Sequence, residues 1–447
     1  MLDEILDRLI AVAQEAKAAY VAGRTRVVRA GESLQAALDT GGLIEFEGVH
    51  EGTYVARVSG TTLTGRPGAR IHGPAGVVPA LTVPPGTRQM AFHAFQATSD
   101  GSEAIIRIGA NDESQTRLEQ EPDGITLRGI VVPSHRGKRA IELHARDVTV
   151  EACDIRDVYD PRLYDSQAIG GTNSSGMIRI IGNHLEAGSE NILFGGDTAR
   201  MGVQTTSVLI EGNTIRKPLS WQTDGINRAV KNLIEFKRGA QIVIRQNTLD
   251  GCWRASQQGY AIVLTPTRDG NLEDVLIQDN QITNVGGGLQ ILGRAYRYVT
   301  ASRTKVRCER NTWQIDHRRF GGTGSLAVAE AEPLAIEFVD EVVQASGSRL
   351  FAYAFGDVMD ADGTVRRGGQ LGVLRMHRIT ATVGSYGITL DGFKSDGVST
   401  TAYVNGGPNR EGFVSVAEMD VAGNTFSGPS MSSVMKRNFP ENTYSAG

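Results

Sequence analysis

Short apolar runs rich in β-branched residues recur along the middle of the chain, and each run ends at an asparagine. Clear copies occupy 208–215, 242–249 and 275–282, and worn copies occupy 178–185 and 306–313. The asparagines advance by 30, 34, 33 and 31 residues, at Asn183, Asn213, Asn247, Asn280 and Asn311. Repetition at this period indicates stacked supersecondary units, and short β-branched runs closed by polar turns predict that the units are made of strands.

Each repeat also contains a second apolar run, at 191–194, 232–236, 261–264, 289–292 and 334–338. With no helical pattern between the runs, a fold of alternating strands and helices is disfavoured. The sequence instead predicts an all-β, single-stranded right-handed parallel β-helix whose rungs lie about 4.8 Å apart. The repeated asparagines are expected to stack at one corner, where Asn tolerates left-handed geometry and its amide can bond to neighbouring rungs.

The first 22 residues are interpreted as a separate unit. Their apolar positions alternate by four and three residues, at Leu2, Leu6, Leu9, Ala13, Ala16 and Tyr20. This spacing predicts an amphipathic helix at 1–22 that oligomerises, as a trimer, or docks; packing against the coil itself is the alternative. Residues 23–447 are predicted to form the β-helix, with an N-terminal cap helix at 31–42 and less regular rungs after 320.

Composition narrows the functional classes. The 447 residues carry a net charge of −4, so neither nucleic acid nor a membrane is an expected partner. The cysteines, Cys153, Cys252 and Cys308, are far apart and are interpreted as buried small apolar residues. No metal-ligand spacing, cofactor fingerprint or transmembrane run is present, so neither a metal nor a cofactor is expected. The acidic start of the chain does not fit a secretion signal.

Six phrases in the middle of the chain resemble those of a known family, and they lie at 165–169, 190–197, 217–221, 230–237, 259–266 and 288–294. From about Thr25 to the C-terminus the chain resembles the pectin-lyase-like right-handed parallel β-helix proteins of bacteria. The resemblance implies a β-helix throughout and association with polysaccharide, without implying one reaction. The order of helix and coil is similar in layout to that of bacteriophage tailspike and fibre proteins.

The candidate chemistry lies on the rungs between 165 and 238. Equivalent positions on neighbouring rungs are one inter-strand spacing apart, which suits the carboxylate pair of a retaining glycosidase. The catalytic candidates are Asp165, Glu190, Lys231 and Glu235, with Glu190 expected beneath Lys231. The candidates for contacts to sugar are Gln167, Asn191, Asp197, Trp221, Arg238, Trp253 and Tyr260. The alternative is a row of exposed ion pairs, each of which contributes little.

Two functions of different class remain open at this point. The first is a virion-associated spike or fibre protein, a homotrimer that attaches to other virion proteins through 1–22 and contacts a cell-surface polysaccharide. Its expected location is the virion, with an extracellular location as the alternative. The second is a polysaccharide lyase or glycoside hydrolase on the same scaffold.

Overall fold

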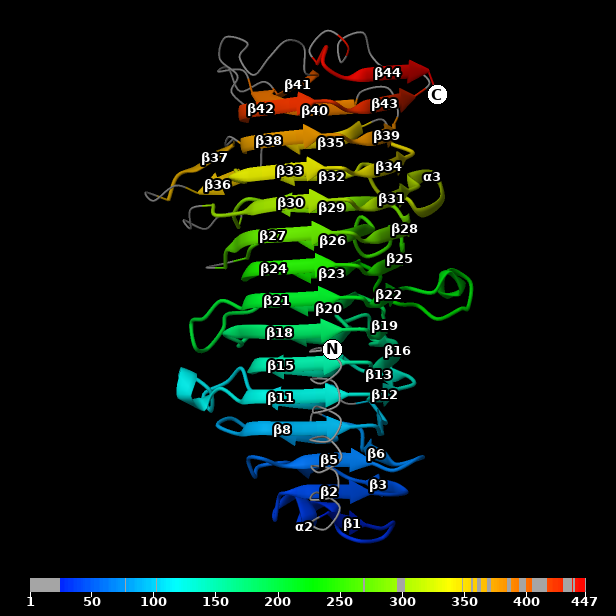
Figure 1. The fold of residues 1–447 in the computed structure, drawn as a ribbon, viewed down its shortest axis with the longest axis vertical. Coiled ribbons are helices and arrows are strands. Elements are labelled where there is room, and N and C mark those ends of the chain that lie inside the picture. Colours follow the sequence, from blue (N-terminus) through cyan, green and yellow to red (C-terminus); the bar gives the residue numbers. More distant parts are fainter. Residues whose placement is uncertain are drawn as a thin grey trace, which may run out of the picture.

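The computed structural model describes residues 25–446 except 77, 102, 268–269, 296–301, 348, 355–356, 360–362, 368–370, 384–386, 394–398, 404–415, 429–435 and 437–438. The helix predicted at 1–22 lies outside the described residues. Three long parallel sheets, A, B and C, run the length of the coil and confirm the predicted right-handed parallel β-helix (Figure 1). The chain visits A, B and C in turn, and each circuit adds a rung.

Sheet A contains β1 (Arg26–Val28), β2 (Leu43–Phe46), β5 (Thr62–Gly65), β8 (Arg88–His93), β11 (Asp123–Arg128), β15 (Arg146–Glu151), β18 (Gly176–Ile181), β21 (Thr206–Glu211), β24 (Gly239–Arg245), β27 (Leu272–Gln278), β30 (Lys305–Glu309), β33 (Ala335–Val339), β38 (Leu371–His377) and β42 (Val416–Ala422). Sheet B contains β3 (Val49–Glu51), β6 (Arg70–Gly73), β9 (Gln96–Ser99), β12 (Val131–Val132), β13 (His135–Arg136), β16 (Asp154–Tyr159), β19 (His184–Ala187), β22 (Thr214–Arg216), β25 (Thr248–Cys252), β28 (Gln281–Val285), β31 (Thr312–Ile315), β34 (Val342–Ala345), β39 (Thr380–Thr382), β43 (Thr425–Gly428) and β44 (Thr443–Ala446). Sheet C contains β4 (Tyr54–Val55), β7 (Leu81–Val83), β10 (Ala104–Gly109), β14 (Arg139–His144), β17 (Gln167–Gly171), β20 (Glu190–Phe194), β23 (Asn232–Phe236), β26 (Tyr260–Leu264), β29 (Gly287–Leu292), β32 (Ala327–Glu330), β35 (Arg349–Ala354), β40 (Gly387–Phe393) and β41 (Ser399–Tyr403).

The remaining described elements are short. They are the helices α2 (Leu34–Leu38) and α3 (His317–Phe320), the 3-10 turns η1 (Leu118–Gln120) and η2 (Leu219–Gln222), and the antiparallel pair β36 (Asp357–Met359) and β37 (Val365–Arg367). Helix α2 falls within the predicted cap at 31–42 and lies at the N-terminal end of the coil (Figure 1). The rungs continue past 320, with β41 antiparallel to β40.

Each repeated phrase is two strands joined at an asparagine corner. The phrase at 208–215, for example, spans the end of β21, the corner residue Asn213 and the start of β22. The residue before the asparagine adopts the left-handed conformation, such as Gly212 with φ 65° and Gln246 with φ 57°, so the prediction that Asn itself would do so was wrong. The run at 334–338 was also misplaced, because it lies mainly on β33 in sheet A, and β32 is the strand of sheet C in that unit.

The repeated asparagines stack as predicted and connect the rungs. The backbone N–H groups of Asn183, Asn213, Asn247 and Asn280 each donate to Oδ1 of the next asparagine at 2.8–2.9 Å. Each Nδ2 donates to that same oxygen and to a carbonyl of the preceding rung, which satisfies the buried amides. The asparagines therefore have the architectural role that their spacing indicated.

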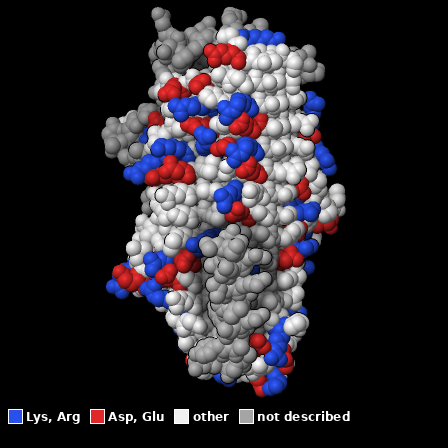
Figure 2. Space-filling view, viewed as in Figure 1, with Lys and Arg blue, Asp and Glu red and all other residues white. Residues whose placement is uncertain are grey.

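The interior of the coil is mainly aliphatic with several buried aromatic rings, and its outside carries mixed charge. The three cysteines are buried and unpaired with one another, as expected. On the outer face of sheet A, Arg307 and Arg375 both pair with Glu337, at 2.9 and 2.8 Å. Figure 2 shows positive and negative side chains interspersed on the viewed face instead of one patch of a single sign.

Candidate functional site

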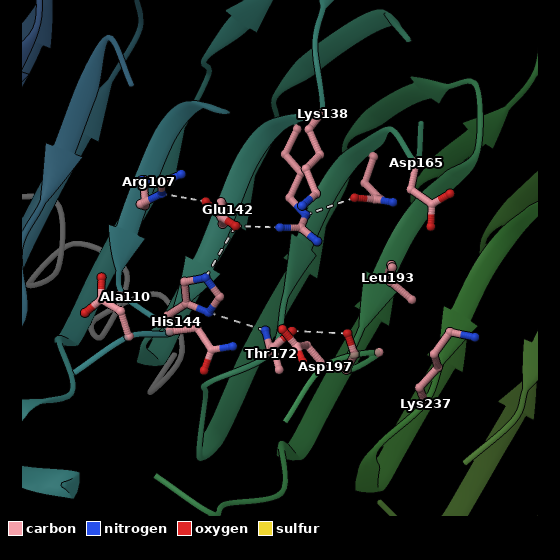
Figure 3. A pocket seen from close by; sticks show the side chains of 16 residues that line it. Arg107, Ala110, Lys138, Glu142, His144, Asp165, Thr172, Leu193, Asp197 and Lys237 are labelled. Carbon is pink, nitrogen blue, oxygen red and sulfur yellow. Dashed lines mark hydrogen bonds and ion pairs between the residues drawn. The ribbon is translucent and has the colours of Figure 1, made fainter. Parts of the chain in front are cut away.

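A cavity of about 610 Å³ lies on the outer face of sheet C, across strands β10 to β23 (Figure 3). Its lining residues are Arg107, Ala110, Asn111, Asp112, Lys138, Arg139, Glu142, His144, Asp165, Gln167, Thr172, Leu193, Gly195, Gly196, Asp197 and Lys237. The cavity thus extends over successive rungs, and its floor consists mainly of charged and polar side chains.

Loops that join sheet C to sheet A fix one border of this cavity. The loop after β10 is tied to the following rungs, because Gln115 Nε2 donates to the carbonyl of His144 at 2.7 Å. Asn173 Nδ2 in turn donates to the carbonyl of Ala110 at 2.9 Å. Asn111 Nδ2 reaches the carbonyl of Thr198 in the loop after β20 at 3.2 Å. These bonds hold the rim in one position relative to the sheet.

A continuous row of hydrogen bonds crosses the floor of the cavity. Glu142 accepts from Arg107 Nε at 2.6 Å and from Arg139 Nη1 at 2.5 Å. Arg139 Nε also donates to Gln167 Oε1 at 2.9 Å on the next rung. Gly170 makes room for this arginine, because a Cβ at that position would lie 2.9 Å from Arg139 Nε.

The row continues into the predicted catalytic cluster. Gln167 Nε2 donates to Glu190 Oε2 at 2.7 Å, and Lys231 Nζ lies 3.4 Å from Glu190 Oε1 and 2.5 Å from Asp165 Oδ1. The predicted register was wrong by one residue, because Glu190 pairs with Asn232 and not with Lys231. The long lysine side chain nevertheless bridges the two carboxylates, so the structure brings these candidates together.

Glu235, the fourth catalytic candidate, lies on β23, the strand that immediately follows Lys231. It pairs with Lys237, and its Oε2 accepts from Asn232 Nδ2 at 2.9 Å. Burial and, next, the charge of Glu235 raise the pKa of Glu190 to about 7, although Lys231 opposes this shift. Burial by itself would lower the pKa of Lys231, but Glu190 and Asp165 raise it. Glu190 can therefore change its protonation state near neutral pH.

Access to this carboxyl group is limited. Glu190 and Glu235 are each 1% exposed, whereas the side chain of Asp165 is 47% exposed. Of the four catalytic candidates, Asp165 lines the cavity, whereas Glu190, Lys231 and Glu235 lie outside its lining. The arrangement therefore presents the Asp165 carboxylate to the cavity and keeps Glu190 buried behind it.

His144 is held as a neutral imidazole. Its Nδ1 accepts from the backbone N–H groups of Thr172 at 3.4 Å and Asn173 at 3.2 Å, so its proton resides on Nε2, 3.5 Å from Glu142 Oε1. Burial lowers the pKa of His144. Burial alone would raise the pKa of Glu142, but the hydrogen bond from His144 and the charges of Arg139 and Arg107 lower it overall.

Several predicted sugar contacts lie elsewhere. Asn191 points into the coil, is 0% exposed and accepts from Lys217 Nζ at 2.9 Å, so it is not on the outer face. The error arose because two consecutive residues point inward where β20 begins. Trp221 and Tyr260 are buried, and the guanidinium of Arg228 lies 4.2 Å from the Trp221 ring centroid, so neither ring presents an open face.

Of the other predicted sugar contacts, two line the cavity and two lie outside it. Gln167 and Asp197 line the cavity. Arg238 is buried and its Nη1 donates to the carbonyl of Val203 at 2.9 Å, which makes it part of a loop contact. Trp253 is half-buried in the loop between β25 and β26 and does not line the cavity.

Sequence reasoning missed much of the site. The overlooked cavity residues include Arg107, Lys138, Arg139, Glu142, His144 and Lys237. Glu142 and His144 alternate with buried aliphatic residues on β14, which was a readable signal of an outward polar face. The sequence around Arg107 and Lys138 gave no such signal, because these side chains form a site only together with side chains of the next rung. Tyr164 was also missed: it is 63% exposed and immediately precedes Asp165.

No group of three or more His, Cys, Asp or Glu residues in the described part of the chain is arranged to hold a metal ion. None of the described helices is long and apolar enough to cross a membrane.

No protein-family model matches the chain, and no curated protein matches it. Among solved structures it is similar to the Dettilon tailspike protein, with 11% identity over 89% of this chain and 68% of that one, at a TM-score of 0.41. Tailspike protein 2 of Escherichia coli O157:H7 bacteriophage CAB120 shares 8% identity over 87% of this chain and 43% of its own, at a TM-score of 0.39. The family 28 exopolygalacturonase of Yersinia enterocolitica shares 11% sequence identity over 89% of this chain and 78% of its own, at a TM-score of 0.40. These are pectin-lyase-like parallel β-helix folds, the fold that the sequence resemblance implied.

Proposed function

We propose that the cavity on sheet C binds a polysaccharide chain of a cell surface. The observation that carries this proposal is the row of fixed charged and polar groups from Arg107 to Gln167 along the floor of a cavity of about 610 Å³. Glu190 and Lys231 continue this row beside the cavity lining. Sugar hydroxyls both donate and accept hydrogen bonds, so a lining of mixed carboxylates, amides and cations suits them. Equivalent positions along the cavity recur at the spacing of neighbouring rungs, which also suits a polymer of repeating sugar units.

The rigidity of the lining supports binding without reorganisation. Arg139 is held by Glu142 and Gln167, and Lys231 is held by Asp165 and Glu190. Groups that are already fixed lose little conformational entropy when a ligand arrives, which favours affinity. Tyr164 precedes the lining residue Asp165 in the sequence and is 63% exposed, with the Arg162 guanidinium 4.9 Å from its ring centroid. The exposed part of its ring offers an apolar surface for a sugar.

A titration of the full chain with a panel of bacterial surface polysaccharide fragments tests this proposal by calorimetry. We expect Asp165→Ala, in the cavity, to weaken binding about tenfold, the loss of one charge-assisted hydrogen bond. Lys305→Ala changes an exposed lysine on sheet A and should leave affinity unchanged. Absence of binding across the panel, or equal affinity in both variants, would refute the assignment.

A second candidate function is a polysaccharide lyase or glycoside hydrolase at the same place. The pKa of Glu190, raised to about 7 by burial and by Glu235, favours it, because a general acid works best near the operating pH. Incubation with polysaccharide would release reducing ends or unsaturated uronates, and Glu190→Gln should abolish that release. Turnover that survives this substitution would remove Glu190 from the mechanism.

We also propose that the protein is a spike or fibre on a virion, with an extracellular location as the alternative. In this proposal it assembles as a trimer through residues 1–22. The heptad spacing of Leu2 to Tyr20 supports it. Light scattering of the full chain and of a variant lacking 1–22 tests it: the expected result is a trimer that becomes a monomer. A full chain that is monomeric would contradict the spike.

A further inference from the structure

A second cavity, of about 380 Å³, lies on the outer face of sheet B near the helix α3. It is lined by Asn284, Gln314, Ile315, Asp316, Arg318, Arg319, Phe320, Gln344, Ala345, Ser346 and Thr382. It is built by β28, β31, β34 and β39 together with α3, and shares no lining residue with the cavity on sheet C.

An uncharged polar column forms the wall of this cavity on the sheet. Gln314 is in register with Gln344 on the next rung, and Gln344 with Thr382 on the one after. Their side chains are exposed and follow one another at about 4.8 Å, the spacing of neighbouring strands. The column presents amide and hydroxyl groups, which donate and accept hydrogen bonds.

Polar groups at the two ends of the column are already paired. Below it, Asn284 Nδ2 donates to Asp250 Oδ1 at 2.7 Å. Above it, the hydroxyls of Thr382 and Ser427 lie 3.0 Å apart. Between these ends, the side chains of Gln314 and Gln344 make no hydrogen bond to any described residue. The unused hydrogen-bonding capacity is therefore confined to the cavity.

Helix α3 holds two arginines at the edge of this column. Asp316 Oδ1 accepts from the backbone N–H groups of Arg318 and Arg319, at 3.0 and 3.4 Å, and so begins the helix. At the other end Phe320 is 4% exposed and anchors the helix in the coil. Within the described chain, neither Arg318 nor Arg319 forms an ion pair, unlike Arg307 and Arg375 on sheet A. The Arg319 guanidinium lies 4.9 Å from the Phe320 ring centroid, a contact with the ring that leaves its N–H donors without a carboxylate among the described residues.

The cavity has an excess of positive charge. Asp316 is the carboxylate among the lining residues, and it is engaged by the helix backbone. Arg318 and Arg319 add two guanidinium groups, whose planar donors match the oxygens of a carboxylate or a sulfate. Cationic donors beside a column of amides suit a ligand that combines an anionic group with hydroxyls.

We propose that this cavity is a second carbohydrate site, specific for an oligosaccharide that bears an anionic group. The anionic group binds Arg318 and Arg319, and the sugar hydroxyls bond to Gln314, Gln344 and Thr382. The proposal does not depend on the function of the cavity on sheet C, because it rests on different residues and on donors that have no carboxylate partner among the described residues. It adds a charge selectivity that the paired lining of sheet C does not provide.

Hydrogen exchange of the full chain tests the site with four probes: a trisaccharide of galacturonic acid, a sulfated disaccharide, the neutral maltotriose, and inorganic sulfate. We expect the carboxylated, the sulfated or both acidic sugars to slow exchange in 312–320 and 342–346, with maltotriose giving no protection. Which acidic sugar binds more tightly identifies the anionic group. Protection by inorganic sulfate equal to that by the sulfated sugar would mean that the sugar is not recognised, and would overturn the proposal.

Substitutions assign the effect to this cavity. Replacing both Arg318 and Arg319 by Ala should weaken the acidic sugar about tenfold or more, and Gln344→Ala about threefold, as expected for charged and neutral hydrogen bonds. Arg136→Ala, an exposed arginine elsewhere on sheet B, is the matched control and should have no effect. Asp165→Ala should leave protection of 312–320 intact, which separates this site from sheet C. Wild-type affinity in the double arginine variant, or no protection by any acidic sugar, would refute the site.

Discussion

The two cavities differ in how their polar groups are satisfied. On sheet C the charged groups of the floor bond to one another, so Glu142 is held by Arg107 and Arg139. On sheet B the column side chains Gln314 and Gln344 find no partner among the described residues. The first arrangement contributes to folding and fixes the shape of its surface, whereas the second leaves its hydrogen-bonding capacity to a ligand.

The difference follows from where the polar residues lie in the coil. Strand β14 carries Arg139 and Glu142 and lies between β10 and β17, which supply the partners Arg107 and Gln167. Strands β31 and β34 carry uncharged amides, and the nearest charges stand on a separate helix. Buried charge networks are costly to disrupt, and exposed amides are cheap to change. Substitutions should therefore separate the two surfaces.

The largest expected contrast comes from one arginine on each surface. Arg139→Met leaves Glu142 with fewer partners in a site where its side chain is 11% exposed, so we expect a loss of about 4 kcal/mol in the free energy of unfolding. Arg319→Met removes an exposed arginine without an ion pair among the described residues and should change that free energy by about 0.5 kcal/mol or less. Urea unfolding at pH 7 measures both. Equal losses would show that the two surfaces do not differ in this way.

A second contrast uses pH. The pKa of Glu190 is raised to about 7 from its usual value of 4.5, mainly by burial, so the folded protein favours the protonated form. The resulting stability is fully present below pH 4.5 and is lost as pH rises through 7, by about 3 kcal/mol in total. Glu190→Gln should remove this loss, so its unfolding free energy falls less between pH 4.5 and 7.5 than that of the wild type.

Gln241→Ala on sheet A is the control for this titration, because it changes an exposed side chain bonded to Ser207 and removes no titratable group. The curves of this variant and the wild type should remain parallel between pH 4.5 and 7.5. If the curve for Glu190→Gln were also parallel to that of the wild type, Glu190 would not be the group that titrates.

The repeat in the sequence was sufficient to predict the fold, because each rung contacts only its neighbours. The five asparagines revealed the period, and their ladder confirmed it. The alternation of inward and outward side chains along a strand was a less reliable guide to side-chain direction at the corners. Two successive inward residues at the start of β20 placed Asn191 inside, and the register beside Glu190 shifted by one.

The candidate sites were harder to predict, because their residues meet only through stacking of long side chains. The Lys231 side chain reaches Glu190 from a position one residue out of the predicted register. The predicted contact is therefore present although the predicted register was wrong. The cavity on sheet B was missed altogether. Its glutamines alternate with apolar residues as in any exposed strand. Nothing in the sequence of α3 shows that Arg318 and Arg319 have no carboxylate partner in the part of the chain that the structure describes.

A smaller effect is expected at the corner behind the sheet B cavity. Glu341 occupies the ladder position after Asn311, whose Nδ2 donates to it at 2.9 Å, and also accepts from the indole of Trp313. Burial raises the pKa of Glu341 to about 7. Glu341→Asn should extend the asparagine ladder while losing the indole bond, a net change of about 1 kcal/mol at pH 5. The variant should lose less stability than the wild type between pH 4.5 and 7.5, and parallel pH curves in urea unfolding would contradict this account.

The smallest expected effect on stability tests whether α3 positions the arginines. Ser346 Oγ accepts from the backbone N–H of His317 at 2.8 Å and lies 2.7 Å from its Nδ1. Ser346→Ala should cost about 0.5 kcal/mol in global unfolding, since Phe320 still anchors the helix, but should speed hydrogen exchange at 316–320 and weaken the acidic sugar about threefold. Ser207→Ala, which removes an exposed hydroxyl bonded to Gln241 on sheet A, should do neither. A large global loss for Ser346→Ala would place this cavity with the stabilising surface of sheet C, and unchanged affinity would mean that the arginines bind without help from α3.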